Sequence, residues 1–199
     1  MTRIEVARLD FPILRTKEEF EHGNLPENLA EAQRAIVSAQ HLVVIFPLWH
    51  GTMPALLKAF IEQVMRPGVA LEYREHGFPK GLLTGRSARL VVTMGMPALI
   101  YRWYFRARGV RGLEHSGLKF AGMKPLRETL LGMVDAASDA KRRRWLDRMR
   151  DYCRRLVLRL PASVMFTRQA RLHRREYGHG RAKMVVFLGF LHFHQSVWK

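Results

Sequence analysis

Two short, largely apolar runs restrict the fold of this chain more than any other feature. Residues 41–46 (HLVVIF) and 88–93 (ARLVVT) are rich in branched side chains, and a proline or a glycine soon follows each run. Strands that are apolar along most of their length are buried on both faces, as in a parallel sheet covered by helices. Helical periodicity is found at residues 26–39, from residue 52 to the break at 66–68, and from residue 138 onward. Together with strand patterns at residues 4–9 and 127–134, this alternation predicts an α/β domain.

The loops that follow the two apolar strands are the first places to expect a ligand. In open α/β sheets, ligands bind beyond the carboxyl ends of the strands. The first loop contains Trp49, whose indole offers a flat surface to a ring, close to backbone N–H groups at the start of a helix. The second contains Gly95, which lets the backbone approach a ligand, and Tyr101, which can donate a hydrogen bond or a proton. Each loop taken alone is equally consistent with a structural turn, with Trp49 packed on its own domain.

Taken together, the two loops and their spacing resemble a known family. Residues 46–48 read FPL and are followed by PALLK at 54–58, which matches a Pro-x-x-Leu-Lys helix start. Residues 93–95 read TMG, with Tyr101 eight positions after the threonine, and residues 120–125 read FAGMKP. These motifs resemble the flavodoxin-like NAD(P)H:quinone reductases, which bind FAD or FMN. The resemblance extends over about residues 4–155.

The resemblance implies a flavin site and its chemistry. A flavin, FAD or FMN, would accept a hydride from NAD(P)H and pass it to a quinone-like small molecule, in a homodimer. Tyr101 matches the tyrosine that assists hydride transfer, whereas Ala107 stands where some members have a histidine. The substrate would stack on the flavin under the aromatic residues 103–105. The implied flavin-binding residues are Pro47, Leu48, Trp49, His50, Gly51, Thr93, Met94, Gly95 and Met96.

The chain departs from the family at its beginning, because residues 4–9 match the family's second strand. The expected fold is a flavodoxin-like parallel sheet with helices on both faces, whose first strand is either missing or supplied by the C-terminal tail. Residues 1–160 would form the flavin-binding domain, and residues 161–199 a basic extension with a linker and a strand at 184–191. In the second alternative the chain is circularly permuted, and His194, Gln195 and Ser196 after that strand bind the cofactor phosphate.

The charge distribution supports a different class of function. The formal net charge is +17, and residues 101–199 contain 23 basic and 7 acidic side chains, whereas residues 1–100 contain 11 and 10. A basic half of this kind attracts anionic membrane or nucleic acid, although it is equally typical of a solvated surface. The alternatives to an enzyme are therefore a non-catalytic basic binding or regulatory module, and a truncated, inactive family member.

Cysteine content and hydropathy exclude several other classes. Cys153 is the only cysteine, so neither a disulfide framework nor a multi-cysteine zinc site is available. The histidines of the tail have no consistent metal-ligand spacing, and no metal is expected. The longest apolar run, residues 184–191, is much shorter than the roughly 20 residues of a spanning helix. We expect a cytoplasmic protein.

Overall fold

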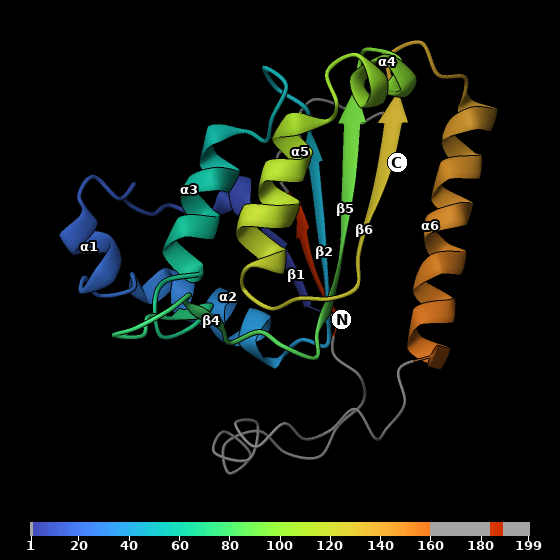
Figure 1. Ribbon diagram of the computed structural model, residues 1–199. Helices are drawn as coiled ribbons and strands as arrows, with labels where there is room; N and C mark the ends of the chain where they lie inside the picture. The colour runs from blue at the N-terminus through green and yellow to red at the C-terminus, as the bar shows by residue number, and fades with distance from the viewer. Residues whose placement is uncertain (1, 160–183, 189–199) are drawn as a thin grey trace.

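The computed structural model describes residues 2–159 and 184–188, which form a parallel sheet covered by helices (Figure 1). The order of the strands across the sheet is β1-β7-β2-β5-β6. The five strands are β1 (Thr2–Glu5), β2 (His41–Pro47), β5 (Ser87–Met94), β6 (Leu126–Gly132) and β7 (Met184–Leu188). The main helices are α2 (Glu27–Ser38), α3 (Ala55–Val64), α4 (Ala98–Trp103), α5 (Arg108–Gly112), the π-helical segment η2 (Leu113–Lys119) and α6 (Asp139–Arg159).

Strand β7, from the C-terminal tail, lies between β1 and β2. It pairs in parallel with both, so that Val186 is opposite Arg3 on one side and Val43 on the other. The strand order is that of the flavodoxin-like sheet, 2-1-3-4-5, with β7 in the position of the first strand. Of the two predicted alternatives, the tail therefore supplies the missing strand. The predicted strand 184–191 is five residues long over the described part, and the division into 1–160 and 161–199 stays a prediction.

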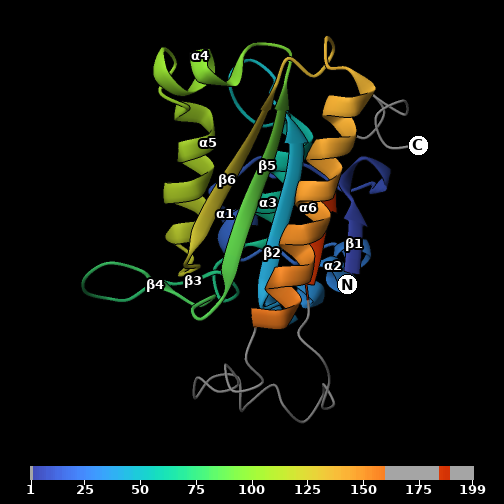
Figure 2. The same ribbon diagram turned by 90° about the vertical axis from the view of Figure 1, so that its right-hand side faces the viewer.

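The two faces of the sheet are covered by different helices, as the alternation along β2 requires. Leu42, Val44 and Phe46 belong to the larger core, which α2, α3 and α5 complete. Val43 faces the other way and belongs to a smaller cluster closed by Trp145 and other residues of α6. Figure 2 shows α6 on one side of the sheet and α3 and α5 on the other. The predicted arrangement of a parallel sheet with helices on both faces is confirmed.

Local structure differs from the sequence prediction in two places that matter for the site. The strand predicted at 4–9 ends at Glu5, because residues Val6–Arg8 form a 3-10 turn that buries Val6. Thr52 was expected to cap the next helix, but α3 begins after Pro54 without a side-chain cap. Thr52 instead bonds to Trp49 in a tight turn.

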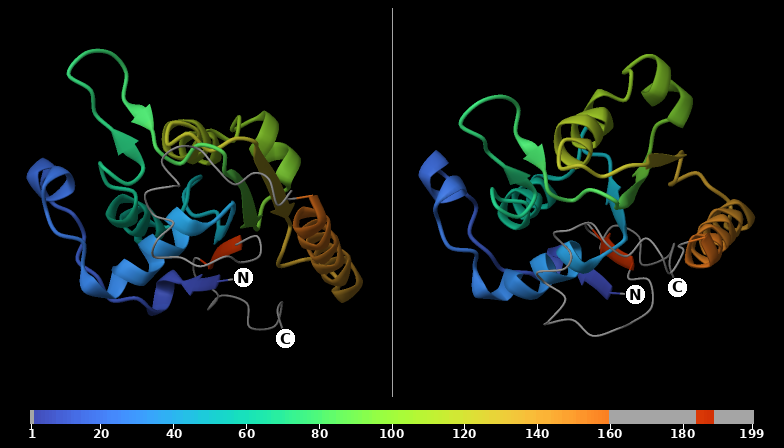
Figure 3. Two further views of the ribbon diagram at one scale, coloured as in Figure 1. Left: turned by 90° about the horizontal axis from the view of Figure 1, so that it is seen from below. Right: turned by 60° about the horizontal axis from the view of Figure 1, so that its bottom comes forward.

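Some short elements were not predicted from the sequence. Helix α1 (Lys17–Glu21) is capped by Thr16, whose hydroxyl accepts a hydrogen bond from the Glu19 amide at 3.1 Å. Strands β3 (Leu71–Glu72) and β4 (Lys80–Gly81) form a hairpin whose loop projects away from the sheet (Figure 3). With two residues in each strand, this hairpin has no periodicity for a sequence to display.

Several predictions fall on parts of the chain that the structure does not describe. The basic linker, the tail histidines and the phosphate-binding residues His194, Gln195 and Ser196 lie outside the described residues. Among the helices of residues 2–159, none is both long enough and apolar enough to cross a membrane.

Candidate functional site

The loops after β2 and β5 meet at one edge of the sheet, because these strands are parallel neighbours. Pro47 is opposite Thr93 in the register. The backbone amide of Leu48 then donates to the carbonyl oxygen of Thr93 at 2.8 Å, which extends the pairing into the loops. The two segments that the sequence nominated separately, 47–51 and 93–96, therefore lie side by side.

The first loop is a two-residue turn that projects an aromatic ring. The amide of Trp49 donates to the carbonyl of Thr52 at 2.9 Å, and the amide of Thr52 donates back at 2.9 Å. The two central residues, His50 (φ 46°) and Gly51 (φ 79°), both have left-handed backbone conformations. Glycine adopts this conformation without cost, whereas histidine does so only where the surroundings hold it. The turn leaves Trp49 41% exposed beside the ends of the strands.

Tyr101 links the first loop to the second from below. Its side chain is buried, and its hydroxyl donates to the carbonyl oxygen of Gly51 at 2.9 Å. The same oxygen accepts a hydrogen bond from the amide of Val110 at 3.3 Å. Burial raises the pKa of Tyr101, and the bond from Val110 only partly offsets this effect. The hydroxyl is therefore protonated at neutral pH and holds the turn in place.

Helix α5 presses its backbone against the same turn. A Cβ atom added to Gly109 would lie 2.1 Å from the carbonyl oxygen of Gly51, so only glycine permits this approach. Arg106 and Ala107, just before the helix, have positive φ angles of 55° and 49°. Strained non-glycine residues of this kind cluster at functional sites. This role of α5 was not predicted, and the only sequence signal for it is a glycine among arginines.

The loop after β6 supports the second loop from the other side. The amides of Met133 and Val134 donate to the carbonyls of Met96 and Met94 at 3.1 and 3.2 Å. The side chain of Met94 is buried, so this residue offers only its backbone to a ligand, whereas Met96 is half-buried and Gly95 is exposed. The contribution of the β6 loop was also not predicted from the sequence.

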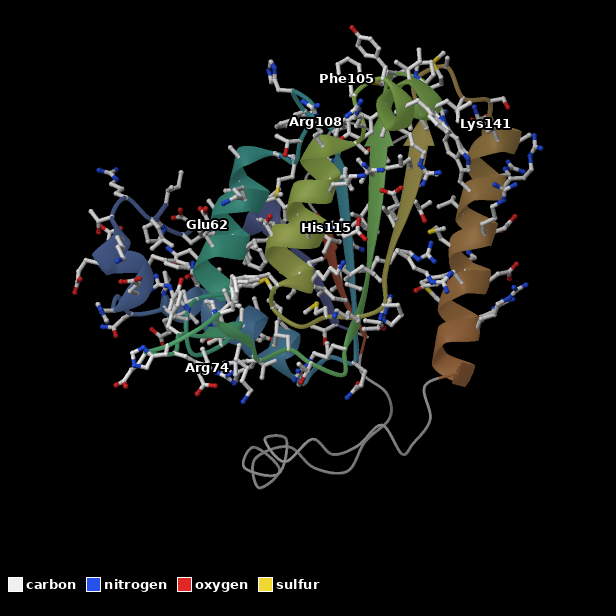
Figure 4. The ribbon with its side chains drawn as sticks, in the orientation of Figure 1. Glu62, Arg74, Phe105, Arg108, His115 and Lys141 are labelled. Carbon is white, nitrogen blue, oxygen red and sulfur yellow. The ribbon has the colours of Figure 1, made fainter. Side chains whose placement is uncertain are left out.

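The residues at this edge fit a flat, polar-edged ring such as a flavin. The exposed indole of Trp49 and the exposed backbone at Gly95 flank a place where no buried side chain intervenes. Strand β7 ends at the same edge, since Leu188 lies opposite Ile45, so the chain beyond it leaves next to the turn. Figure 4 shows Phe105 and Arg108 at this end of the molecule. The arrangement can bind a ring on its face and its edge, and can place cations nearby.

No metal site accompanies this arrangement in the part of the chain that the structure describes. There, no three side chains of His, Cys, Asp or Glu come together in a group that could hold a metal ion.

Comparison with known proteins gives the family. A sequence profile described as a flavodoxin-like fold matches residues 2–153, which is most of the chain. The chain belongs to the flavodoxin-like fold family. Its relatives within this family include quinone reductases, and the resemblance seen in the loop motifs is confirmed.

Members of the flavodoxin-like fold family that resemble this chain carry informative names. Human ribosyldihydronicotinamide dehydrogenase [quinone] is 28% identical over 138 residues, which are 65% of this chain and 58% of the human protein. An FMN-dependent NADH:quinone oxidoreductase from Jannaschia sp. (strain CCS1) is 40% identical over 82 residues, 41% of this chain and 40% of that protein. The chain spans about half the length of the curated relatives that it matches.

A solved structure of the flavodoxin-like fold gives the same picture. The NAD(P)H:quinone oxidoreductase from Methanothermobacter marburgensis superposes with a TM-score of 0.57 at 26% identity, covering 73% of this chain and 77% of that one. The structure brings the predicted flavin-binding residues together, but their role and that of Tyr101 stay predictions.

Proposed function

We propose that this chain is a flavin-dependent NAD(P)H oxidoreductase that reduces quinones or similar acceptors. The observation that carries the proposal is the meeting of the loops after β2 and β5, held by the bond from the Leu48 amide to the Thr93 carbonyl. This edge of the sheet is where ligands of open α/β folds bind. The names of the relatives, which include NADH:quinone oxidoreductases, support the same reaction class.

The loops would hold the flavin ring by its edge and one face. Trp49 would flank the ring, while backbone groups of Gly51 and Gly95 would meet its polar atoms. When bound, the flavin supplies the hydride chemistry, taking two electrons from NAD(P)H and delivering them to the quinone. The remaining residues proposed for the cofactor site are Pro47, Leu48, His50, Thr93, Met94 and Met96.

For Tyr101 we propose that holding the turn and assisting the reaction are separable. Its hydroxyl is engaged with the Gly51 carbonyl at 2.9 Å, so a proton-transfer role requires that this bond be released. Replacement by phenylalanine distinguishes the two roles: a positioning role weakens flavin binding, whereas a role in the reaction lowers kcat with flavin bound.

The cofactor, the partner and the compartment are proposed at different depths. FMN is favoured over FAD by the relatives whose names specify FMN dependence. The donor is NADH or NADPH. A homodimer and a cytoplasmic location remain predictions from the family resemblance, and sedimentation of the purified chain measures the former.

The experiment that tests the proposal is a flavin titration followed by a turnover assay. The purified chain is mixed with FMN or with FAD and dialysed, and the flavin absorbance that stays with the protein is measured. NADH or NADPH oxidation is then followed with and without a benzoquinone.

The matched variants are Trp49→Ala at the site and Phe78→Ala in the β3–β4 loop, where Phe78 is 88% exposed and far from the sheet edge. We expect the first variant to lose flavin and the second to retain it. A folded chain that retains neither flavin nor quinone-dependent turnover overturns the proposal, and leaves the non-catalytic module or the inactive family member.

A further inference from the structure

A cluster of large apolar side chains stands in solvent at the end of the sheet. It consists of residues on helix α4 and just after it, which we name the α4 tip. Trp103 and Tyr104 are 77% and 80% exposed, and Leu99 is 70% exposed. Contiguous exposed apolar groups of this size mark a surface that binds something. The α4 tip comprises Leu99, Ile100, Trp103, Tyr104 and Phe105.

The tip is an ordered projection rather than a loose loop. Helix α4 lies across the ends of β5 and β6, at the top of the molecule in Figure 1. The rings of Tyr104 and Phe105 pack edge to face with centroids 5.0 Å apart. Arg102 anchors the helix through an ion pair with Glu128 on β6 at 2.5 Å. The exposed rings are therefore presented by a fixed support.

Cations surround the α4 tip. Exposed Arg106 and Arg108 follow it directly in the chain, and the first turns of α6, which begin beside α4, add Lys141, Arg143 and Arg144 (Figure 4). The carboxylates nearby are fewer, and Glu128 and Asp139 are paired with Arg102 and Arg142. Asp135 is the other carboxylate of this region. The rim of the tip is positively charged.

We propose that the α4 tip docks the protein on an anionic lipid bilayer. Trp and Tyr rings favour the headgroup region, where one end of the ring is apolar and the other is hydrated. Basic side chains at the rim add attraction to anionic headgroups. This placement brings the sheet edge close to the membrane, the phase in which long-chain quinones dissolve. The proposal does not depend on flavin chemistry, since only the surface of α4 and α6 carries it.

Two other occupants fit the tip less well. A second copy in a symmetric dimer would bring the basic rim against itself, and like charges oppose such an interface. Nucleic acid would pair with the arginines but offers little to Leu99 and Ile100, which are aliphatic and exposed. A lipid surface satisfies both the apolar residues and the charges.

The test is co-sedimentation of the full chain with vesicles of phosphatidylcholine alone or of phosphatidylcholine with phosphatidylserine. The tip variant is Trp103→Ser with Tyr104→Ser. Its matched control is Tyr73→Ser with Phe78→Ser, which removes two exposed aromatic residues from the remote β3–β4 loop. A second pair compares Arg143→Gln with Arg144→Gln at the upper end of α6 against Arg154→Gln with Arg155→Gln near its lower end.

We expect binding to the phosphatidylserine vesicles, little to phosphatidylcholine alone, and a decrease of about tenfold or more for the tip variant but not for its control. Each upper arginine removed should lower binding by about fivefold at low salt, the equivalent of the usual contribution of a basic residue near an anionic membrane. Circular dichroism confirms that each variant is folded.

Three results overturn the proposal. The first is no binding to phosphatidylserine vesicles at low salt. The second is binding that the tip variant and its control share equally, which assigns attachment to charge alone. The third is sedimentation equilibrium showing a dimer that the tip variant abolishes, which assigns the tip to a second copy.

Discussion

At the scale of single residues, Tyr101 is the buried group that connects most parts of the site. Its hydroxyl bridges the Gly51 carbonyl and the Val110 amide, at 2.9 and 3.3 Å. Tyr101→Phe keeps the ring but leaves two buried backbone groups without this partner. We expect a loss of about 1–3 kcal/mol in the free energy of unfolding, measured by urea denaturation.

The control for this change is Tyr73→Phe, because Tyr73 is exposed in the hairpin loop. Removal of its hydroxyl should alter the free energy of unfolding by less than about 0.5 kcal/mol. Equal effects of the two substitutions would contradict the bridging role of Tyr101.

His41 gives the protein a pH-dependent stability on the opposite edge of the sheet. Burial, with a smaller effect of the Arg89 charge, lowers its pKa from 6.5 to about 4. Its ring contacts the Ser87 hydroxyl at 2.7 Å and the Tyr152 hydroxyl at 3.2 Å, while Arg89 lies 3.6 Å from the centre of the Tyr152 ring. The neutral form is therefore the one that the fold accommodates.

A depressed histidine pKa makes the unfolded chain bind protons first as the pH falls. The contribution of His41 is complete above pH 6.5 and is lost as the pH falls toward about 4, on the order of 3 kcal/mol in total. The measurement is the free energy of unfolding at several pH values. His41→Gln should flatten this slope relative to the wild type, and His76→Gln, an exposed histidine, should leave it unchanged.

At the scale of elements, the position of α5 depends on one glycine. Gly109→Ala would place a methyl group 2.1 Å from the Gly51 carbonyl oxygen, so α5 and the turn must move apart. We expect a destabilisation of about 1–3 kcal/mol or more, together with weaker flavin retention, because the turn moves.

The same helix provides the control. Gly112 has open space within 4 Å of an added Cβ and a helical backbone, with φ −58°. Gly112→Ala should therefore stabilise the chain by about 0.5–1 kcal/mol, as expected for a helical glycine replaced by alanine. The two variants are compared by thermal denaturation, and destabilisation by both would contradict the close approach of α5.

The elements that could be predicted are those whose burial shows in their own sequence. Strands β2 and β5 were placed to within about one residue, because both of their faces are apolar. The 3-10 turn at Val6–Arg8 was not, since local alternation continues through it. At the site, the loops were identified by their motifs, but the roles of Gly109 and Gly132 arise from contacts with Gly51 and Ala98, which no local pattern encodes.

At the scale of the whole molecule, the sheet depends on a strand that is far away in the sequence. Deletion of residues 184–199 removes β7 and leaves β1 and β2 with unpaired facing edges. We expect the truncated chain to lose cooperative unfolding, because a parallel sheet split at this position cannot bury both halves. The measurement is thermal denaturation followed by circular dichroism.

A synthetic peptide tests whether the strand itself is what the truncated chain lacks. Peptide 181–199 should restore cooperative unfolding when added to it. The same peptide with Val186→Pro should fail, since proline removes a backbone donor from the ladder at the residue opposite Arg3 and Val43. Restoration by both peptides, or by neither, would contradict the placement of β7.

The central position of β7 also sets the order of events during translation. The strand is synthesised after every other element that the structure describes, although it lies between the first strand and the next one in the sheet. At about 5–20 residues per second, β1 and β2 wait roughly 7–30 s for their common neighbour. Throughout that interval, the nascent polypeptide on the ribosome offers two open strand edges, and a neighbouring chain on the same messenger RNA is the competitor that its own tail must outpace.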